Sequence, residues 1–301
     1  MKIIVVGDGH FCDHSPIKRL DIIRVMQLSK LSKIRSISIE KGVDAVVFLG
    51  DIFDKAKPDT SLVNQVIEEM VQFRCPLFSI VGNHCTQGCK DGVNGTAIGT
   101  LFASGVMEHL GELLFKGIQL IGYDHTNKHN LDMYRNFQAS VIFTHNMVVP
   151  YEVPYDHMSA HDILKVIKNT VVFSGDFHLP FIKENDHSVV INPGVLVRTS
   201  IAEKDVDPSV ILFEASGSST YKFESISLGA VKGDDIFDLV RHEREKEEEI
   251  NLKRFIDSIK STQFQSQDIE ALVTEVGNNS NIEKRIINEA INRIRSAKAL
   301  N

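Results

Sequence analysis

The sequence has 301 residues, of which 43% are hydrophobic and 24% are charged, and this composition excludes a disordered or fibrous protein. The formal net charge of −7 argues against a protein that wraps nucleic acid with its whole surface. It does not exclude a DNA substrate, because bound divalent cations would change the local field.

The amino-terminal strand-like run, residues 3–6, contains four apolar residues, which is too short for a secretory signal or a membrane span. The chain has four cysteines and no CxxC pair, so we expect reduced thiols and neither a disulfide framework nor a zinc ribbon. These features predict a cytoplasmic protein without a membrane partner.

Short runs rich in β-branched residues alternate with helical patterns from residue 1 to about residue 215. The segments expected as strands are residues 3–6, 45–49, 77–81, 118–122, 141–144, 171–174, 189–192 and 210–214. Amphipathic helices are expected over residues 17–39 and 61–73. This alternation predicts a layered α/β domain in which helices flank the sheets.

The composition changes after about residue 228, where a charged run over residues 241–249 precedes a helical pattern. Its apolar face is expected to contain Leu252, Phe255, Ile256 and Ile259. A second helix is predicted by six residues at helical spacing, namely Ile282, Ile286, Ile287, Ala290, Ile291 and Ile294. The polar stretch 277–281 before it is typical of a turn that supplies a helix N-cap. We therefore expect a separate helical tail.

Side chains of the types that bind metal ions follow the carboxyl ends of five predicted strands, where α/β sheets place their ligands. They are Asp8, His10, Asp51, Asn83, His145, Asp176 and His178. A single Gly-Asp pair after a strand is most often only a turn, but five such sites in one domain are improbable as accidents. Together they predict one metal centre.

The spacing and chemistry of these residues suit a pair of ions. Asp8 and His10, at i and i+2, lie on the same side of an extended segment, and a second such pair follows residues 171–174. The Asp51 carboxylate can bridge two cations, whereas Asn83 offers a neutral oxygen. Mixed oxygen and nitrogen ligands suit manganese, iron, zinc or cobalt. Glycines precede four of the sites, at positions 7, 50, 82 and 175, and let the chain turn sharply without backbone bulk.

The motifs Gly-Asp-x-His, Gly-Asp-x-x-Asp, Gly-Asn-His, a lone His and Gly-x-x-His resemble those of the calcineurin-like metallophosphoesterase superfamily, over roughly residues 1–215. The resemblance implies an αββα sandwich that binds two divalent metal ions. It assigns Asp8, His10, Asp51 and His178 to the first metal, and Asp51, Asn83, His145 and Asp176 to the second. It also implies that His84 is the proton donor, and the position of His84 directly after Asn83 agrees, since it can point toward a leaving group.

Two positions depart from the superfamily pattern. Asp176 stands where histidine is usual, and this third carboxylate makes the site harder, so we expect manganese or magnesium rather than zinc. Cys85 stands where an acidic residue usually follows the Asn-His pair. Because a thiol is a poor acceptor, we expect His84 to be oriented in an unusual way.

The segment 192–200, followed by Glu203, resembles the corresponding region of SbcD-type DNA repair and recombination nuclease subunits, of which phages encode small versions. The resemblance implies a tail that contributes to a cap and binds the coiled-coil base of an SMC-like ATPase of the SbcC type, with a homodimer as a further possibility. It divides the chain into a catalytic domain (1–215), a linker or reduced cap (216–249) and a partner-binding helical tail (250–301). An apolar helical stripe packs on its own domain about as often as on a partner, so this alternative stays open.

The sequence therefore predicts a two-metal DNA nuclease, in the host cytoplasm if a phage encodes it. Lys18, Arg19 and Arg198 are candidates for contacts with the DNA backbone, although solvated surface charge is the alternative for each. Two other functions remain: a small-molecule phosphodiesterase or phosphoprotein phosphatase with the same metals, and an inactive scaffold for a coiled-coil ATPase.

Overall fold

The computed structural model describes residues 1–126, 130–135, 140–216, 220–261, 269–280 and 282–298. The chain divides into two compact units, Met1–Phe237 and Asp238–Asn301. Within the described ranges, no helix has both the length and the apolar character needed to cross a membrane.

The first sheet of the unit Met1–Phe237 has the strand order β14-β13-β1-β2-β3-β4. Its strands are β1 (Lys2–Val6), β2 (Ala45–Phe48), β3 (Leu77–Ser79), β4 (Glu108–His109), β13 (Ser209–Ala215) and β14 (Tyr221–Ser227). Strands β1 to β4 are parallel, whereas β13 pairs antiparallel with both β1 and β14. The carboxyl ends of the parallel strands therefore share one edge.

The second sheet has the order β11-β12-β10-β7-β6-β5, with β6, β7, β10 and β12 parallel. Its strands are β5 (Glu112–Phe115), β6 (Ile118–Tyr123), β7 (Ser140–Thr144), β10 (Val171–Ser174), β11 (Phe181–Glu184) and β12 (Val189–Asn192). A short parallel pair, β8 (Val148–Val149) and β9 (Met158–Ser159), follows β7 in the chain. Each of the eight strands expected from the sequence is present.

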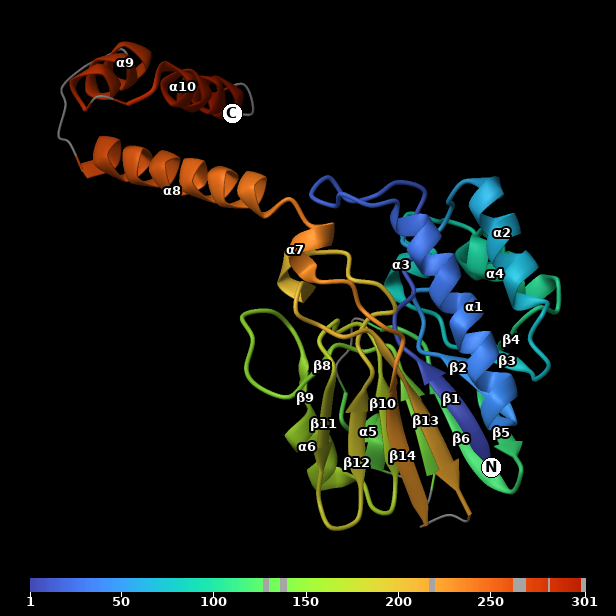
Figure 1. Ribbon diagram of the computed structural model, residues 1–301. Helices are drawn as coiled ribbons and strands as arrows, with labels where there is room; N and C mark the ends of the chain where they lie inside the picture. Colours follow the sequence, from blue (N-terminus) through green and yellow to red (C-terminus); the bar gives the residue numbers. More distant parts are fainter. Residues whose placement is uncertain (127–129, 136–139, 217–219, 262–268, 281, 299–301) are drawn as a thin grey trace. The chain divides into compact units, whose positions relative to one another are not determined.

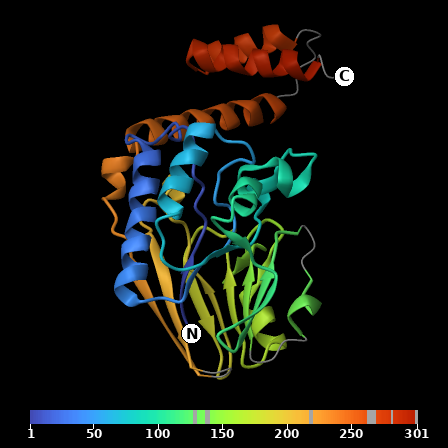
Figure 2. The same ribbon diagram turned by 90° about the vertical axis from the view of Figure 1, so that its right-hand side faces the viewer.

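Alternating side chains join the two sheets into one sandwich. Along β1, Ile3 and Val5 belong to the apolar cluster between the sheets, whereas Ile4 and Val6 belong to the cluster under the helices. From the second sheet, Phe143 and Phe173 stack between the sheets with ring centroids 5.5 Å apart. Figures 1 and 2 show α1 (Ile23–Lys41) and α2 (Thr60–Met70) on one side of the strands and α5 (Asp132–Arg135) and α6 (Ala160–Val166) on the other. This arrangement confirms the predicted αββα sandwich.

The remaining short elements of this unit are α3 (Asn83–Thr86), η1 (Gly92–Gly95), α4 (Ala97–Ala103), η2 (Ile201–Glu203) and α7 (Gly233–Ile236). The helix expected from residue 17 begins only at Ile23, because the preceding residues are tied elsewhere. The Leu20 amide donates to the carbonyl of Ile236, and the Ile23 amide donates to the Ser15 hydroxyl. Apolar spacing before Ile23 could not reveal these remote contacts.

The unit Asp238–Asn301 contains α8 (Leu239–Ser261), α9 (Ile269–Asn279) and α10 (Lys284–Lys298). Leu252 and Phe255 of α8 pack with Val273, Ile287 and Ala290 in a core of their own. The expected face residue Ile259 lies outside the described side chains.

Helix α9 was not predicted. The turn expected over residues 277–281 is wrong over residues 277–279, because α9 continues to Asn279, whereas Ser280 does lie in a turn. Asn281 lies outside the described residues. A Cβ atom at Gly277 would lie only 2.5 Å from the side chain of Ile287. This glycine therefore allows α9 and α10 to pack closely rather than forming a turn.

The compact units divide after Phe237, within the range 216–249 that was expected to be a linker or reduced cap. Strand β14 lies within the expected linker and pairs with β13 from Tyr221 to Ser227. This strand was not predicted because polar residues alternate with few apolar ones along it. Tyr221 and Phe223 are its side chains that pack against the core between the sheets. Partner binding by the tail stays a prediction.

Candidate metal centre

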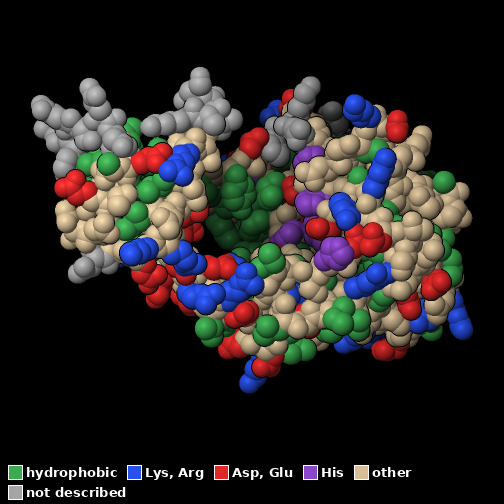
Figure 3. Space-filling model, turned by 90° about the horizontal axis from the view of Figure 1, so that it is seen from above, with side chains coloured by type: hydrophobic (Ala, Val, Ile, Leu, Met, Phe, Trp, Pro, Cys, Tyr) green, Lys and Arg blue, Asp and Glu red, His purple; other side chains and the backbone are tan. Residues whose placement is uncertain are grey.

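The side chains expected to bind metals all come to the shared carboxyl edge of the two sheets. Asp8 and His10 follow β1, Asp51 follows β2, Asn83 follows β3, His145 follows β7, and Asp176 and His178 follow β10. Figure 3 shows histidine side chains gathered beside acidic ones on this face of the molecule. Strand topology thus brings together residues that are far apart in the sequence.

Three of these residues have backbone conformations that residues other than glycine rarely adopt. The φ angle is +43° at His10, +39° at Asp51 and +67° at Asp176. Such conformations cost roughly 1–3 kcal/mol each and persist only where the surrounding structure imposes them. Their concentration at this edge indicates that the edge is shaped for function.

Glycines beside the site leave room for the ligand side chains. A Cβ at Gly82 would lie 2.1 Å from Asp51 Oδ1, and one at Gly175 would lie 2.7 Å from Asp8 Oδ1. Any larger residue at these two positions would displace a carboxylate. This agrees with the role expected for them from the sequence.

One group of candidate ligands consists of Asp8, His10 and His178, whose ligand atoms lie within 4.8 Å of one another. His10 Nε2 and His178 Nε2 are 3.1 Å apart, and Asp8 Oδ2 lies 3.9 Å and 3.7 Å from these two nitrogens. The Asp8 Oδ1 atom is buried without a hydrogen-bond partner. Converging ring nitrogens beside a carboxylate whose other oxygen lacks a hydrogen-bond partner fit a divalent cation.

A second group consists of Asp8, Asp51 and His145, all of them buried. Asp51 Oδ2 lies 3.1 Å from His145 Nε2, and Asn83 Oδ1 lies 3.1 Å from the same nitrogen. Asp51 also forms a third group with His10 and His84. The Asp51 carboxylate thus lies between the two sets of histidines, where a bridging ligand would have to be.

Buried charges at this edge shift the ionisation of the ligands. Burial raises the pKa of Asp8, and the neighbouring histidines only partly offset it. Burial also tends to raise the pKa of Asp51, but the charge of His145 and its hydrogen bond hold it well below the usual range. Burial lowers the pKa of His145, yet Asp51 and Asp8 outweigh burial and raise it to about 10. Without a metal His145 therefore carries a proton, which a divalent ion would replace.

Asp176 lies at the same edge, but among the described residues its carboxylate belongs to none of these three groups. Its backbone amide donates to Asp8 Oδ2 at 3.0 Å. Its charge makes a small contribution to the raised pKa values of His145 and His178. Its assignment as a ligand, and the metal preference that follows from it, stay predictions.

His84 is held by Asp54, the second aspartate of the Gly-Asp-x-x-Asp motif, for which the sequence predicted no role. Its Nδ1 atom donates to the backbone carbonyl of Asp54 at 2.7 Å, and the Asp54 carboxylate lies 3.9 Å away. Cys85, by contrast, is buried in the apolar cluster under the helices, where burial raises the pKa of its thiol to about 12. Asp54, and not Cys85, therefore orients the His84 ring. This role could not be predicted from a sequence motif, because the acceptor is a main-chain carbonyl, which every residue has.

His178 also has a carboxylate partner outside the ligand set. Its Nδ1 atom lies 2.7 Å from Glu203 Oε1, on η2 after β12. Burial lowers the pKa of His178, but Glu203 and Asp8 outweigh burial and raise it. Sequence resemblance pointed to Glu203 without giving it a role.

Arg19 and Arg198 do not lie in position to bind a DNA backbone, contrary to expectation. Both are buried, and their guanidinium groups are used inside the protein. Arg198 donates to the carbonyls of Lys204 and Val231, and Arg19 donates to the carbonyl of Arg198 and to Asp21. Lys18 is partly exposed, and its role stays a prediction.

An exposed aromatic side chain that was not predicted packs on the ring of Phe177. Tyr151 is 57% exposed, and its ring meets the edge of Phe177 with centroids 6.1 Å apart. Phe177 stands between Asp176 and His178 in the chain. An exposed aromatic ring therefore packs on the segment that carries two of the candidate ligands.

Comparison with known proteins agrees with the geometry. Residues 1–192 match the calcineurin-like phosphoesterase family. No curated protein matches the chain. Among solved structures, one from Thermus thermophilus is 12% identical over 76% of this chain and 99% of that chain, with a TM-score of 0.47. A Streptococcus pneumoniae protein described as a predicted phosphoesterase is 16% identical over 75% and 89%, with a TM-score of 0.36.

The family match covers more than half of the chain and includes β1 to β12 with their edge residues. The groups of carboxylates and histidines at that edge are the kind of site that holds divalent metals in such proteins. On this evidence the chain belongs to the calcineurin-like phosphoesterase family.

Proposed function

We propose that this chain is a DNA nuclease that hydrolyses phosphodiester bonds with two divalent metal ions, Mn²⁺ or Mg²⁺. The group Asp8, His10 and His178 and the group Asp8, Asp51 and His145 would hold the ions, and Asp51 also lies beside His10. When bound, such ions activate water and neutralise charge on the phosphate. The rest of the reaction falls to side chains of this chain.

His84 is proposed to protonate the departing sugar oxygen. Because Nδ1 donates to the Asp54 carbonyl, the ring is fixed and Nε2 is the atom available for proton transfer. The side chain is partly exposed, so a substrate can reach it. The Asp51 carboxylate accepts the His84 backbone amide at 2.9 Å, which ties the proton donor to the metal ligands.

The observation that carries DNA as the substrate is the place of the segment resembling SbcD-type nucleases. This segment, residues 192–203, packs against the site, and its last residue, Glu203, hydrogen-bonds the ligand His178. The exposed ring of Tyr151 supports the proposal, because nucleobases stack on such surfaces. An exposed ring that can stack on a base suits a nucleotide substrate better than a small phosphoester without one.

One assay separates the three candidate functions: Mn²⁺-dependent digestion of linear double-stranded DNA beside hydrolysis of a bis-arylphosphate ester. DNA digestion supports the nuclease. Hydrolysis of the ester alone would make the chain a small-molecule enzyme, and neither activity would indicate a scaffold. His84→Ala is the control variant, since contaminating nuclease would survive it.

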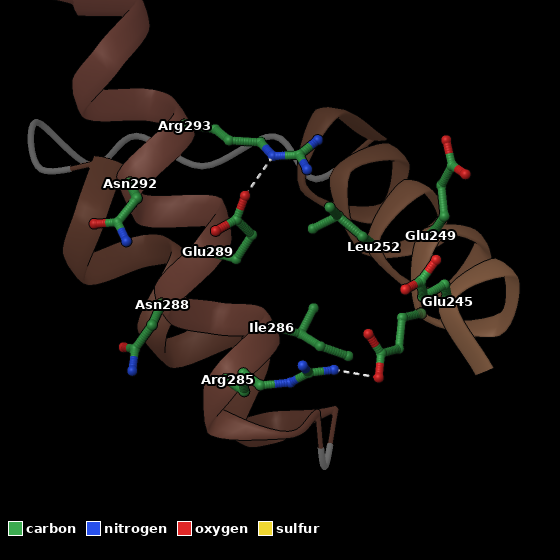
Figure 4. Close-up of a pocket in the computed structure, with 10 residues that line it drawn as sticks. Glu245, Glu249, Leu252, Arg285, Ile286, Asn288, Glu289, Asn292 and Arg293 are labelled. Atoms are coloured by element: carbon green, nitrogen blue, oxygen red, sulfur yellow. Dashed lines mark hydrogen bonds and ion pairs between the residues drawn. The ribbon is translucent and has the colours of Figure 1, made fainter. Parts of the chain in front are cut away.

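We also propose that the unit Asp238–Asn301 binds a coiled-coil ATPase of the SbcC type. Between α8 and α10 lies a pocket of about 600 Å³, lined by four glutamates and two arginines among others (Figure 4). The arginines are paired with acidic neighbours, Arg285 with Glu248 and Arg293 with Glu289. The excess of acidic groups suits a partner helix with basic residues, and the partly buried Ile286 offers an apolar contact to that helix.

Co-purification tests this interaction. The full chain should retain the ATPase coiled coil, and Glu245→Lys combined with Glu249→Lys should release it while ester hydrolysis is unchanged. Equal retention by this variant would exclude the pocket as the binding surface. A homodimer and a cytoplasmic location stay predictions.

A further inference from the structure

We propose that Glu203 is a positioning residue that fixes the tautomer and orientation of His178, and so determines the affinity of one of the two metal sites. This inference rests on the proposed two-metal function but not on DNA as the substrate. It assigns to η2 a role in metal binding that neither its sequence nor its family match provides.

The contact itself sets the tautomer of His178. Glu203 Oε1 accepts a hydrogen bond from His178 Nδ1 at 2.7 Å, so the ring proton is on Nδ1. Nε2 is then left with a free lone pair and points to His10 Nε2, 3.1 Å away, and to Asp8 Oδ2, 3.7 Å away. This is the nitrogen that a metal in the first ligand group would use.

The Glu203 carboxylate cannot easily turn away from the ring. Its other oxygen, Oε2, accepts the backbone amides of Thr199 at 2.5 Å and Ser200 at 3.2 Å. The Ser200 side chain completes a reciprocal capping box at the start of η2. The Glu203 side chain is only 5% exposed, so water does not compete for these contacts.

Two buried arginines hold the turn that carries Glu203. Arg198 donates to the carbonyl of Lys204, directly after Glu203, and to the carbonyl of Val231. Arg19 donates to the carbonyl of Arg198. The two arginines thus donate charge-assisted hydrogen bonds to main-chain carbonyls on both sides of η2. These bonds fix η2, and so hold the Glu203 carboxylate at a constant distance from His178.

A purely structural role is the alternative, in which Glu203 only caps η2. Glu203→Gln separates the two roles, because an amide oxygen can still accept the Thr199 and Ser200 amides. Its NH₂ group would then face His178 Nδ1 as a donor and would move the ring proton to Nε2, where it blocks the metal. Asp205→Asn is the matched control, since Asp205 lies two residues away with its side chain 86% exposed.

The experiment uses the full chain stripped of metal. Mn²⁺ binding is followed by calorimetry and electron paramagnetic resonance, the His178 tautomer by ¹⁵N NMR with His178→Gln to assign its signals, and folding by the melting temperature. We expect Glu203→Gln to weaken one of two Mn²⁺ sites about 10–100-fold, as loss of such outer contacts does. In this variant the ring proton of His178 should move to Nε2, and the melting temperature of the metal-free protein should stay close to that of the wild type. Asp205→Asn should change neither the Mn²⁺ affinity nor the tautomer.

Unchanged Mn²⁺ affinity at both sites, or an unchanged tautomer, in a folded Glu203→Gln protein would overturn the inference. Should the wild type bind no Mn²⁺, the proposed function fails. The tautomer comparison in metal-free protein would then still decide whether Glu203 positions His178.

Discussion

The metal edge of Met1–Phe237 and the helical unit Asp238–Asn301 are built in opposite ways. At the metal edge, contacts join residues that are far apart in the sequence, such as His10 and His178, which are separated by 168 positions. Several of these residues are buried and have strained backbone conformations. In the helical unit, neighbouring helices pack an apolar stripe and place exposed ion pairs outside. Substitutions at the edge should therefore change chemistry, whereas those in the helical unit should change local stability or assembly and leave chemistry intact.

The largest effect is expected for Asp51→Ala, because this buried carboxylate lies between both ligand groups. Losing metal-dependent charge stabilisation costs several kcal/mol, so hydrolysis of the bis-arylphosphate ester should fall about a thousandfold or more. Mn²⁺ stoichiometry, measured on the same samples, should drop below two per chain. His178→Ala should behave similarly; near-normal cleavage by both variants would disprove the metal-site assignment.

His84→Ala should leave a folded, metal-loaded protein whose hydrolysis is about 10²–10⁴-fold slower, the usual contribution of a general acid. Steady-state rates and Mn²⁺ content measured together test this. His84 also lies within 4.8 Å of His10 and Asp51 ligand atoms. Loss of one Mn²⁺ in the variant would therefore reassign His84 from proton donor to ligand.

Tyr151→Ala should weaken DNA cleavage while leaving the small ester unaffected. Stacking of one base on an aromatic ring contributes about 1–3 kcal/mol, so KM for a DNA substrate should rise about fivefold to a hundredfold. Tyr151→Phe keeps the ring and should match the wild type. An equal loss on DNA and ester would instead indicate damage to Phe177 and the metal edge.

The pH dependence of metal binding should reveal His145. A folded pKa near 10, above the ordinary 6.5, means that its charge stabilises the metal-free protein fully below pH 6.5. This stability is lost as the pH rises toward 10. Mn²⁺ must displace the proton on His145 when it binds. As the pH rises from 6.5 toward 10, the affinity of the protein for Mn²⁺ should therefore increase, and the number of protons released on binding should decrease. Calorimetry in buffers of different ionisation enthalpy measures the release, and His145→Gln should reduce the dependence, leaving the part due to His178, whose pKa is also raised.

The ligand-bearing edge could be predicted from sequence because each ligand follows a short apolar run, and parallel strands bring their ends together. Asp54 and Glu203 could not be given roles, since one orients His84 through a main-chain carbonyl and the other meets His178 only after the chain returns along β12. Arg19 and Arg198 looked like surface charges because nothing in their neighbourhood reveals that carbonyls will surround them.

In the helical unit the error was of another kind, because a residue that has a packing role was assigned to a local turn. Its apolar spacing predicted α8 and α10, but Gly277 was taken for a turn because glycine is read as a helix breaker. Its purpose is visible only when α10 is packed beside it, with Ile287 filling the space of a side chain. Local rules thus misjudge a glycine whose role is tertiary.

The smallest effect on catalysis is expected for Gly277→Val, which tests whether the two regions are independent. The new side chain would collide with Ile287 and overpack this core, at a cost of about 1–3 kcal/mol. Differential scanning calorimetry should show a lower transition for the helical unit, while ester hydrolysis stays within about twofold of the wild type. Ala271→Val, at an exposed position of the same helix, controls for the added β-branch. A matching loss of hydrolysis would show that the helical unit supports the metal edge, and the contrast between the two regions would then be wrong.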